Sequence, residues 1–168
     1  MNKPTSESET LAQVYENVRA LTKFYIIKSK DLDSFKRYEV NGVLLNSRYW
    51  LLAHLVWSEH MLLVESLTGK SMDIPWLGQF EYGSEPPQTQ DGLPSLDEVM
   101  SAMNEVHSAA IAAIRSMTDQ DLASETRTGM GFRNDKSKRM VIHHAIRHEP
   151  CHTGQLGWLC KIAGVETI

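Results

Sequence analysis

The sequence of 168 residues has no apolar run of the roughly 20 residues that crossing a bilayer requires. Its first ten residues are polar and lack the apolar stretch of a secretory signal peptide. The 17 lysines and arginines are scattered and are outnumbered by 21 acidic residues, for a formal net charge of −4. A duplex-binding protein concentrates its basic residues on one face. We therefore expect neither a membrane nor a nucleic acid as partner, and a cytoplasmic protein.

Cysteine is scarce, with only Cys151 and Cys160 in the chain. On one helix, two residues at this spacing point to opposite sides and lie about 13 Å apart along the axis. That geometry excludes a disulfide between them, and both are expected to be reduced thiols. Internal repeats, low-complexity tracts and composition shifts are also missing, which indicates a single domain over residues 1–168.

Helical periodicity, by contrast, is present in four segments, where apolar residues recur three and four positions apart. The expected helices cover residues 6–29, 46–68, 95–117 and 138–163. Long connections join them, and the one at 70–93 contains three of the six prolines, as expected of a crossover or of a lid over a site. Four helices with long connections favour an all-α fold, a four-helix bundle.

Local signals set the expected ends and the inward face of these helices. The ends are expected at capping boxes Ser6/Glu9 and Ser95/Glu98, at an N-cap on Asn46, and at the stop residues Gly69 and Gly164. The inward seam of the first helix is expected to comprise Leu11, Val14, Val18, Leu21 and Tyr25.

His148 and His152 are the first candidates for chemistry. Their i, i+4 spacing places both rings on one helix face, within reach of a common ion. They also stand on the apolar seam of the last helix, where two imidazoles without partners would be costly to bury. A divalent metal would remove that cost, whereas a single histidine is more often an ordinary core or surface residue. Pro150 lies between the two, so the helix either kinks there or starts again and loses the spacing.

His54 is the third candidate ligand. It stands within the most apolar helix, in the run from Trp50 to Trp57, and is expected to face inward. Alone it would bind a core partner, but across a bundle from His148 and His152 it completes a set of three. Three histidines with a free coordination position are typical of catalytic metal sites.

Other residues near these histidines have weaker claims. His144 could extend the stripe as a substitute ligand, and Cys151 could compete as a sulfur ligand. Glu59 and Glu149 are expected at the surface or orienting an imidazole, with a general base as the alternative. Gln155 could bind metal-bound water or substrate. Trp50, Trp57 and Trp158 are expected in the core.

Two stretches together resemble the DinB-like (DinB/YfiT) metal-binding four-helix bundles, and the resemblance covers nearly the whole chain. One is the second-helix segment 46–59, with His54 in WLLAHL; the other is 148–156, with the motif H-x-x-x-H-x-G-Q. The resemblance implies an up-up-down-down bundle, often dimeric. It also implies that His54, His148 and His152 hold zinc, nickel or a similar ion such as iron.

The resemblance also implies a range of activities. Relatives include transferases that use low-molecular-weight thiols and a maleylpyruvate isomerase that uses mycothiol. The first hypothesis is therefore a metal-dependent transferase that activates a small thiol, with its electrophile held under the linker at residues 76–82. A metal-dependent hydrolase with Glu149 or Glu59 moving the proton is the second. A non-catalytic, metal-stabilised bundle that binds a small ligand or a partner is the third.

Overall fold

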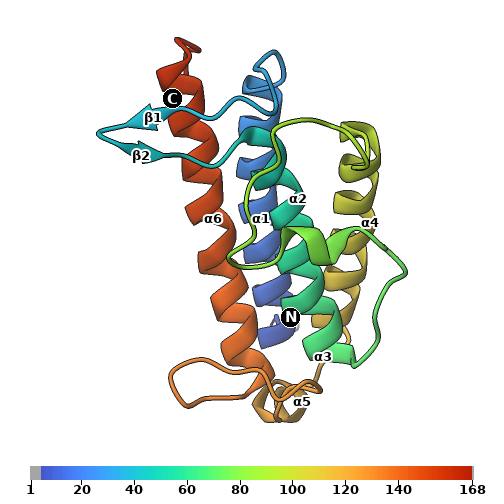
Figure 1. Cartoon of the computed structure of the whole chain (residues 1–168). Helices are drawn as coiled ribbons and strands as arrows, with labels where there is room; N and C mark the ends of the chain where they lie inside the picture. The colour runs from blue at the N-terminus through green and yellow to red at the C-terminus, as the bar shows by residue number, and fades with distance from the viewer. Residues whose placement is uncertain (1–4, 168) are drawn as a thin grey trace.

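The computed structural model describes residues 5–167 and is mostly helical (Figure 1). The helices, in chain order, are α1 (Glu7–Lys28), α2 (Arg48–Glu59), α3 (Ser66–Thr68), α4 (Leu96–Arg115), α5 (Asp119–Ala123) and α6 (Lys138–Ile162). A π-helix, η1 (His60–Glu65), joins α2 to α3, and η2 (Leu77–Phe80) is a 3-10 helix. The strands β1 (Glu39–Val40) and β2 (Val43–Leu44) form an antiparallel hairpin. The all-α prediction is confirmed.

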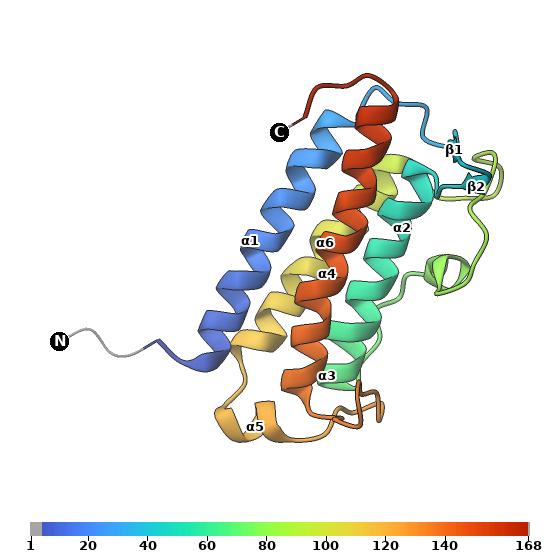
Figure 2. The same ribbon diagram turned by 90° about the vertical axis from the view of Figure 1, so that its left-hand side faces the viewer.

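The four long helices α1, α2, α4 and α6 lie along one another around a shared core (Figures 1 and 2). The start of α6 pairs with the start of α1 through Arg139 and Glu7, and the end of α4 pairs with the first turn of α1 through Arg115 and Glu9. Thus α1 and α6 run one way, and α2 and α4 run the other way (Figure 2). The expected up-up-down-down order is therefore wrong: in chain order the long helices run up, down, down and up. The long connection after α3 leads the chain back along the bundle, so α4 runs parallel to α2 (Figure 2).

Serine side chains begin the long helices. Ser95 and Glu98 form the expected capping box at the start of α4, each binding the backbone N–H of the other. At the start of α1, Ser6 accepts from the N–H of Glu9, but the Glu9 carboxylate binds other side chains, so only half of the expected box forms. The helix starts are therefore correct even where the cap is simpler than expected.

The second long helix differs from expectation at its start and in its last turns. Ser47, not Asn46, is the N-cap of α2, and it accepts the N–H of Trp50. From His60 the helix widens to a π-helix, in which both the N–H and the hydroxyl of Ser66 bind the carbonyl of Met61. The helix ends where expected, at Gly69, whose φ of 75° is left-handed.

The expected inward seam of α1 is wrong in part. Val14 and Leu21 are 40% and 41% exposed, whereas the buried face of α1 includes the polar residues Tyr15, Arg19 and Thr22. α1 carries apolar residues on more than one side, so periodicity alone selects the wrong stripe. The polar residues face inward because other helices supply their partners.

α6 is one continuous helix through Pro150. The proline removes one backbone hydrogen bond but does not end the helix, so His148 and His152 keep their i, i+4 relation. The connections carry the hairpin, η2 and α5, whereas residues 81–95 before α4 form turns and bends without a helix or strand. Within the described part of the chain, no helix combines the length and the apolar character that a membrane span requires.

Candidate metal centre

Three histidine side chains meet between α2 and α6. His54 comes from the middle of α2, and His148 and His152 come from successive turns of α6. One ring nitrogen from each lies within 4.8 Å of the other two. The Nε2 atoms of His148 and His152 are 3.2 Å apart. Two nitrogens bound tetrahedrally to zinc at their usual bond length would be about 3.4 Å apart, so the spacing fits a shared ion.

The ring of His54 is fixed from two sides. Its Nδ1 lies 2.8 Å from the carbonyl oxygen of Phe80 in η2. A carbonyl only accepts, so Nδ1 carries the proton and Nε2 keeps a lone pair, as in histidine ligands whose second nitrogen is hydrogen-bonded. Trp50 stacks on the ring at 4.4 Å between centroids and 9° between planes. The contact with Phe80 could not be predicted from the sequence, because every residue has a backbone carbonyl.

Burial keeps the three imidazoles neutral near pH 7. It lowers the pKa of His54 to about 4, against the opposing effect of the Phe80 hydrogen bond. Burial, followed by the neighbouring His152, His54 and His144, lowers the pKa of His148 to about 3. Burial also lowers the pKa of His152. Neutral rings present lone pairs without first losing a proton, which favours metal binding.

The ring of His152 has an unsatisfied atom. Its Nδ1 is buried and has no hydrogen-bond partner among residues 5–167. Gln155, one turn later, is close enough to affect the pKa of His152, but it borders a different hollow, beside Trp158. Trp158 is 65% exposed, so its expected place in the core is wrong.

The histidines open into a cavity of about 810 Å³. Its walls are mainly apolar and aromatic, with Trp50, Trp57, Met61, Leu62, Met130 and Phe132 among them. The connection before α4 covers one side through residues 82–86, and the loop before α6 covers another through residues 130–132. Part of the linker expected to cover the site therefore does so. A volume of this size accommodates a small organic molecule beside an ion.

His144 borders the same cavity but is not one of the three converging histidines. Its ring stacks on Phe132, with centroids 3.6 Å apart and planes 7° apart, and its Nδ1 lies 3.0 Å from Arg147. The Cys151 thiol is exposed and donates to the carbonyl of Arg147. It does not border the cavity, so it does not compete as a ligand.

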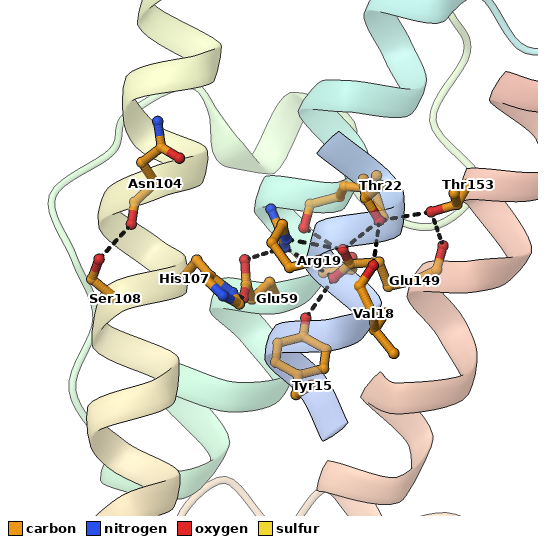
Figure 3. Close-up of polar contacts among 12 residues, drawn as sticks. Tyr15, Val18, Arg19, Thr22, Glu59, Asn104, His107, Ser108, Glu149 and Thr153 are labelled. Carbon is orange, nitrogen blue, oxygen red and sulfur yellow. Dashed lines mark hydrogen bonds and ion pairs between the residues drawn. The ribbon is translucent and has the colours of Figure 1, made fainter. Parts of the chain in front are cut away.

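Glu59 and Glu149 face α1 and not the cavity (Figure 3). Arg19 lies between them: its Nη2 donates to Glu59 Oε2 at 2.6 Å and to Glu149 Oε2 at 3.0 Å, and its Nε lies 2.9 Å from Glu149 Oε1. Both carboxylates are buried, which corrects the expected surface placement. Burial by itself would lower the pKa of Arg19, but the two carboxylates outweigh it and raise that pKa.

Four further side chains complete this buried cluster. Tyr15 and Thr22 donate to the carboxylate of Glu149 at 2.8 and 2.6 Å. The Thr22 hydroxyl lies 2.8 Å from that of Thr153, and His107 donates from Nδ1 to Glu59 at 2.7 Å. These contacts, which Figure 3 shows, bind all four long helices together behind the histidines. Sequence reasoning missed Arg19 and Tyr15 because their partners are far away in the chain: Glu59 is 40 residues from Arg19, and Glu149 is more than a hundred residues from both.

The sequence matches the DinB superfamily over residues 28–156. This region covers most of the chain and includes all three converging histidines. No curated protein matches the sequence. A match of this extent, together with the geometry above, shows that the chain belongs to the DinB superfamily.

Proposed function

We propose that this four-helix bundle is a divalent-metal-dependent transferase that activates a low-molecular-weight thiol. The observation that carries the proposal is the setting of His54, His148 and His152. Their lone pairs converge at the edge of a large apolar cavity. No cysteine borders that cavity within the described residues. The serine hydroxyls that border it are engaged, Ser58 with the carbonyl of Leu55 and Ser84 with the indole N–H of Trp50. We therefore infer that a thiol nucleophile for group transfer would come from a small molecule.

His54, His148 and His152 would hold the ion, and three imidazoles suit zinc or nickel first, with iron also compatible. When bound, such an ion supplies Lewis acidity that lowers the pKa of a coordinated thiol. Phe80 and Trp50 keep the ring of His54 in place. Overall, the thiol sulfur forms a bond to the electrophilic carbon, and the leaving group departs with the thiol proton.

The cavity walls would select the electrophile. Trp57, Met61 and Phe132 offer apolar and aromatic contact, while Arg37 and Glu85 bring charge to the rim. Arg37 is occupied by the carbonyl of Leu45 at 2.9 Å and by Glu85 at 3.6 Å. We therefore expect an apolar or aromatic electrophile. A reduced thiol as cosubstrate also favours a reducing compartment such as the cytoplasm.

The hydrolase hypothesis has less support than the transferase. Its two candidate bases, Glu59 and Glu149, are bound by Arg19 and lie outside the cavity. Glu85 is the one carboxylate that borders the cavity within residues 5–167, and it is exposed and paired with Arg37. A proton acceptor at the three histidines would have to be water or the substrate itself.

Metal content and thiol response test the proposal together. Wild-type protein and His148→Ala would be compared by elemental analysis, then by thermal shift and turnover with a panel of small thiols and a chromogenic aryl halide. We expect bound metal, a thiol-dependent rise in Tm and turnover only in the wild type. Equal metal content in both proteins would refute the metal site. Metal without any thiol response would refute the transferase and favour a non-catalytic bundle.

We also propose a homodimer, as the resemblance to this family implies. The hairpin cluster, which we define as Val43, Leu44 and Trp158, supports a self-association surface. Its members are 62%, 48% and 65% exposed, and Leu44 and Trp158 border a hollow of about 480 Å³ between the hairpin and α6. Exposed apolar surface of this kind often marks an interface.

A further inference from the structure

α3, α5 and the start of α6 come together at one end of the bundle (Figure 1). Residues of these elements line a second hollow of about 600 Å³. The last turns of α4 and residues 64–72 complete its walls. It shares no lining residue with the histidine cavity. A ligand there would contact none of the residues that line the histidine cavity.

Positive charge gathers in this hollow although the chain as a whole carries a net charge of −4. Lys70, Arg127 and Lys138 line it, against a single carboxylate, Asp121. Among residues 5–167, no ion pair forms to any of the three cations. Asp121 already accepts hydrogen bonds from the N–H and hydroxyl of Thr118. Hydrogen bonds from Thr118, and then the nearby Lys138 and Arg127, lower the pKa of Asp121. One carboxylate thus faces three cations without forming an ion pair with any of them, and the hollow keeps an excess of positive charge for a ligand.

Lys138 is the most enclosed of the three cations. It is only 4% exposed, and its side chain has no hydrogen bond or ion pair within the described chain. It also occupies the first turn of α6, where the positive end of the helix dipole disfavours a cation. Its aliphatic stem is buried, while its ammonium keeps contact with solvent at the hollow. An anion in the hollow would neutralise it and would be favoured by the same helix end.

The remaining walls limit the class of anion. Val64, Leu67, Ala109, Ala113 and Met117 make one side apolar. The lining hydroxyls of Thr68 and Ser116 donate to carbonyls of their own helices and are not free to donate to a ligand. We propose that this hollow binds a small organic oxyanion. Its phosphate or carboxylate group would meet Lys138 and Arg127, and its apolar body would lie along α4.

The test is an amide NMR titration of the full-length protein with three probes: phenyl phosphate, benzoate and inorganic phosphate. We expect phenyl phosphate and benzoate to shift amides of residues 66–72, 113–127 and 138–140, and to bind more tightly than inorganic phosphate. Lys138→Met keeps the apolar stem and should weaken binding by roughly tenfold or more.

Two further variants keep the result decisive. Arg127→Gln changes an exposed side chain of the hollow and should weaken binding without affecting folding. Lys161→Met changes an exposed lysine near the other end of α6 and should alter neither binding nor Tm. The proposal is overturned if no probe binds at millimolar concentration, or if Lys138→Met binds as the wild type does. Equal binding of phenyl phosphate and inorganic phosphate would overturn the apolar half of the site.

Discussion

Replacing Arg19 with methionine tests how much the buried cluster contributes to stability. Methionine keeps the unbranched stem of arginine but removes the guanidinium that bridges Glu59 and Glu149. Two carboxylates are then left in the interior, each 2% exposed, without their cation. Removing one partner of a buried ion pair typically costs about 3–5 kcal/mol. We expect a loss of that size in the free energy of unfolding.

The loss converts to a measurable change in Tm. In a domain of this length, 1 kcal/mol corresponds to about 2–4 °C, so Arg19→Met should lower Tm by about 6–20 °C. Urea unfolding followed by circular dichroism gives the free energy, and calorimetry gives the Tm. Arg115→Met is the matched control, because Arg115 pairs with Glu9 and Glu16 at the surface. Exposed pairs contribute little, so its Tm should stay close to the wild type.

A triple variant separates unpaired charge from lost packing. Arg19→Met combined with Glu59→Gln and Glu149→Gln removes the two buried charges along with their cation. Neutral replacement of a buried ion pair is often nearly harmless, so the triple variant should be more stable than Arg19→Met alone. The reasoning is refuted if Arg19→Met costs less than about 1 kcal/mol, or if the triple variant is no more stable than the single one.

Three further expectations concern the histidines, the proline and the hairpin cluster. Metal-free protein should lose stability as pH falls from 6.5 toward 4, by about 1.4 kcal/mol per pH unit for each depressed histidine. The reason is that the pKa values in the folded protein are about 4 for His54 and about 3 for His148, so the unfolded chain binds protons at higher pH than the folded chain does. Urea titrations of chelator-treated protein would contradict this if the free energy of unfolding did not change over that pH range. Pro150→Ala should restore a hydrogen bond to Ile146 and stabilise the protein by up to about 3 kcal/mol, measured by urea unfolding; a lower stability would show that the proline fits its site. Trp158→Asp should convert the proposed homodimer to a monomer in light scattering, and an unchanged mass would place the interface elsewhere.

The sequence sufficed to predict the features that depend on residue type and local spacing. The four long helices, the capping box at Ser95 and the stop at Gly69 all follow from signals within a few residues. The pairing of His148 with His152 follows from helical geometry, because an i, i+4 spacing leaves little freedom. His54 could be added because a histidine inside so apolar a helix had to face a partner.

What could not be predicted depends on partners far away in the chain. The buried face of α1 is polar because Arg19 finds Glu59 and Glu149, and no pattern within α1 reveals them. The orientation of His54 depends on the carbonyl of Phe80, which any residue could supply. Which helices run parallel depends on the path of the connection before α4. That loop has no periodic pattern from which its path could be predicted.

The three histidines and the buried Arg19 cluster both use α6, on different sides of that helix. This arrangement predicts that the cluster affects metal binding. On α6, His148 faces the cavity and the next residue, Glu149, faces α1; His152 and Thr153 repeat the arrangement one turn later. α1 supplies no metal ligand, yet its contacts with Glu149 and Thr153 fix how α6 is rotated. We therefore expect Glu149→Gln to weaken metal binding by about tenfold, as outer groups that orient ligands commonly do.

Competition with a chromophoric chelator measures that affinity at a temperature where the variant is fully folded. Arg115→Met, which leaves α6 untouched, should bind metal as the wild type does. If Glu149→Gln lowers Tm but keeps wild-type affinity, the cluster stabilises the fold without positioning the ligands. If affinity falls while the control is unchanged, α1 takes part in the site through the rotation of α6.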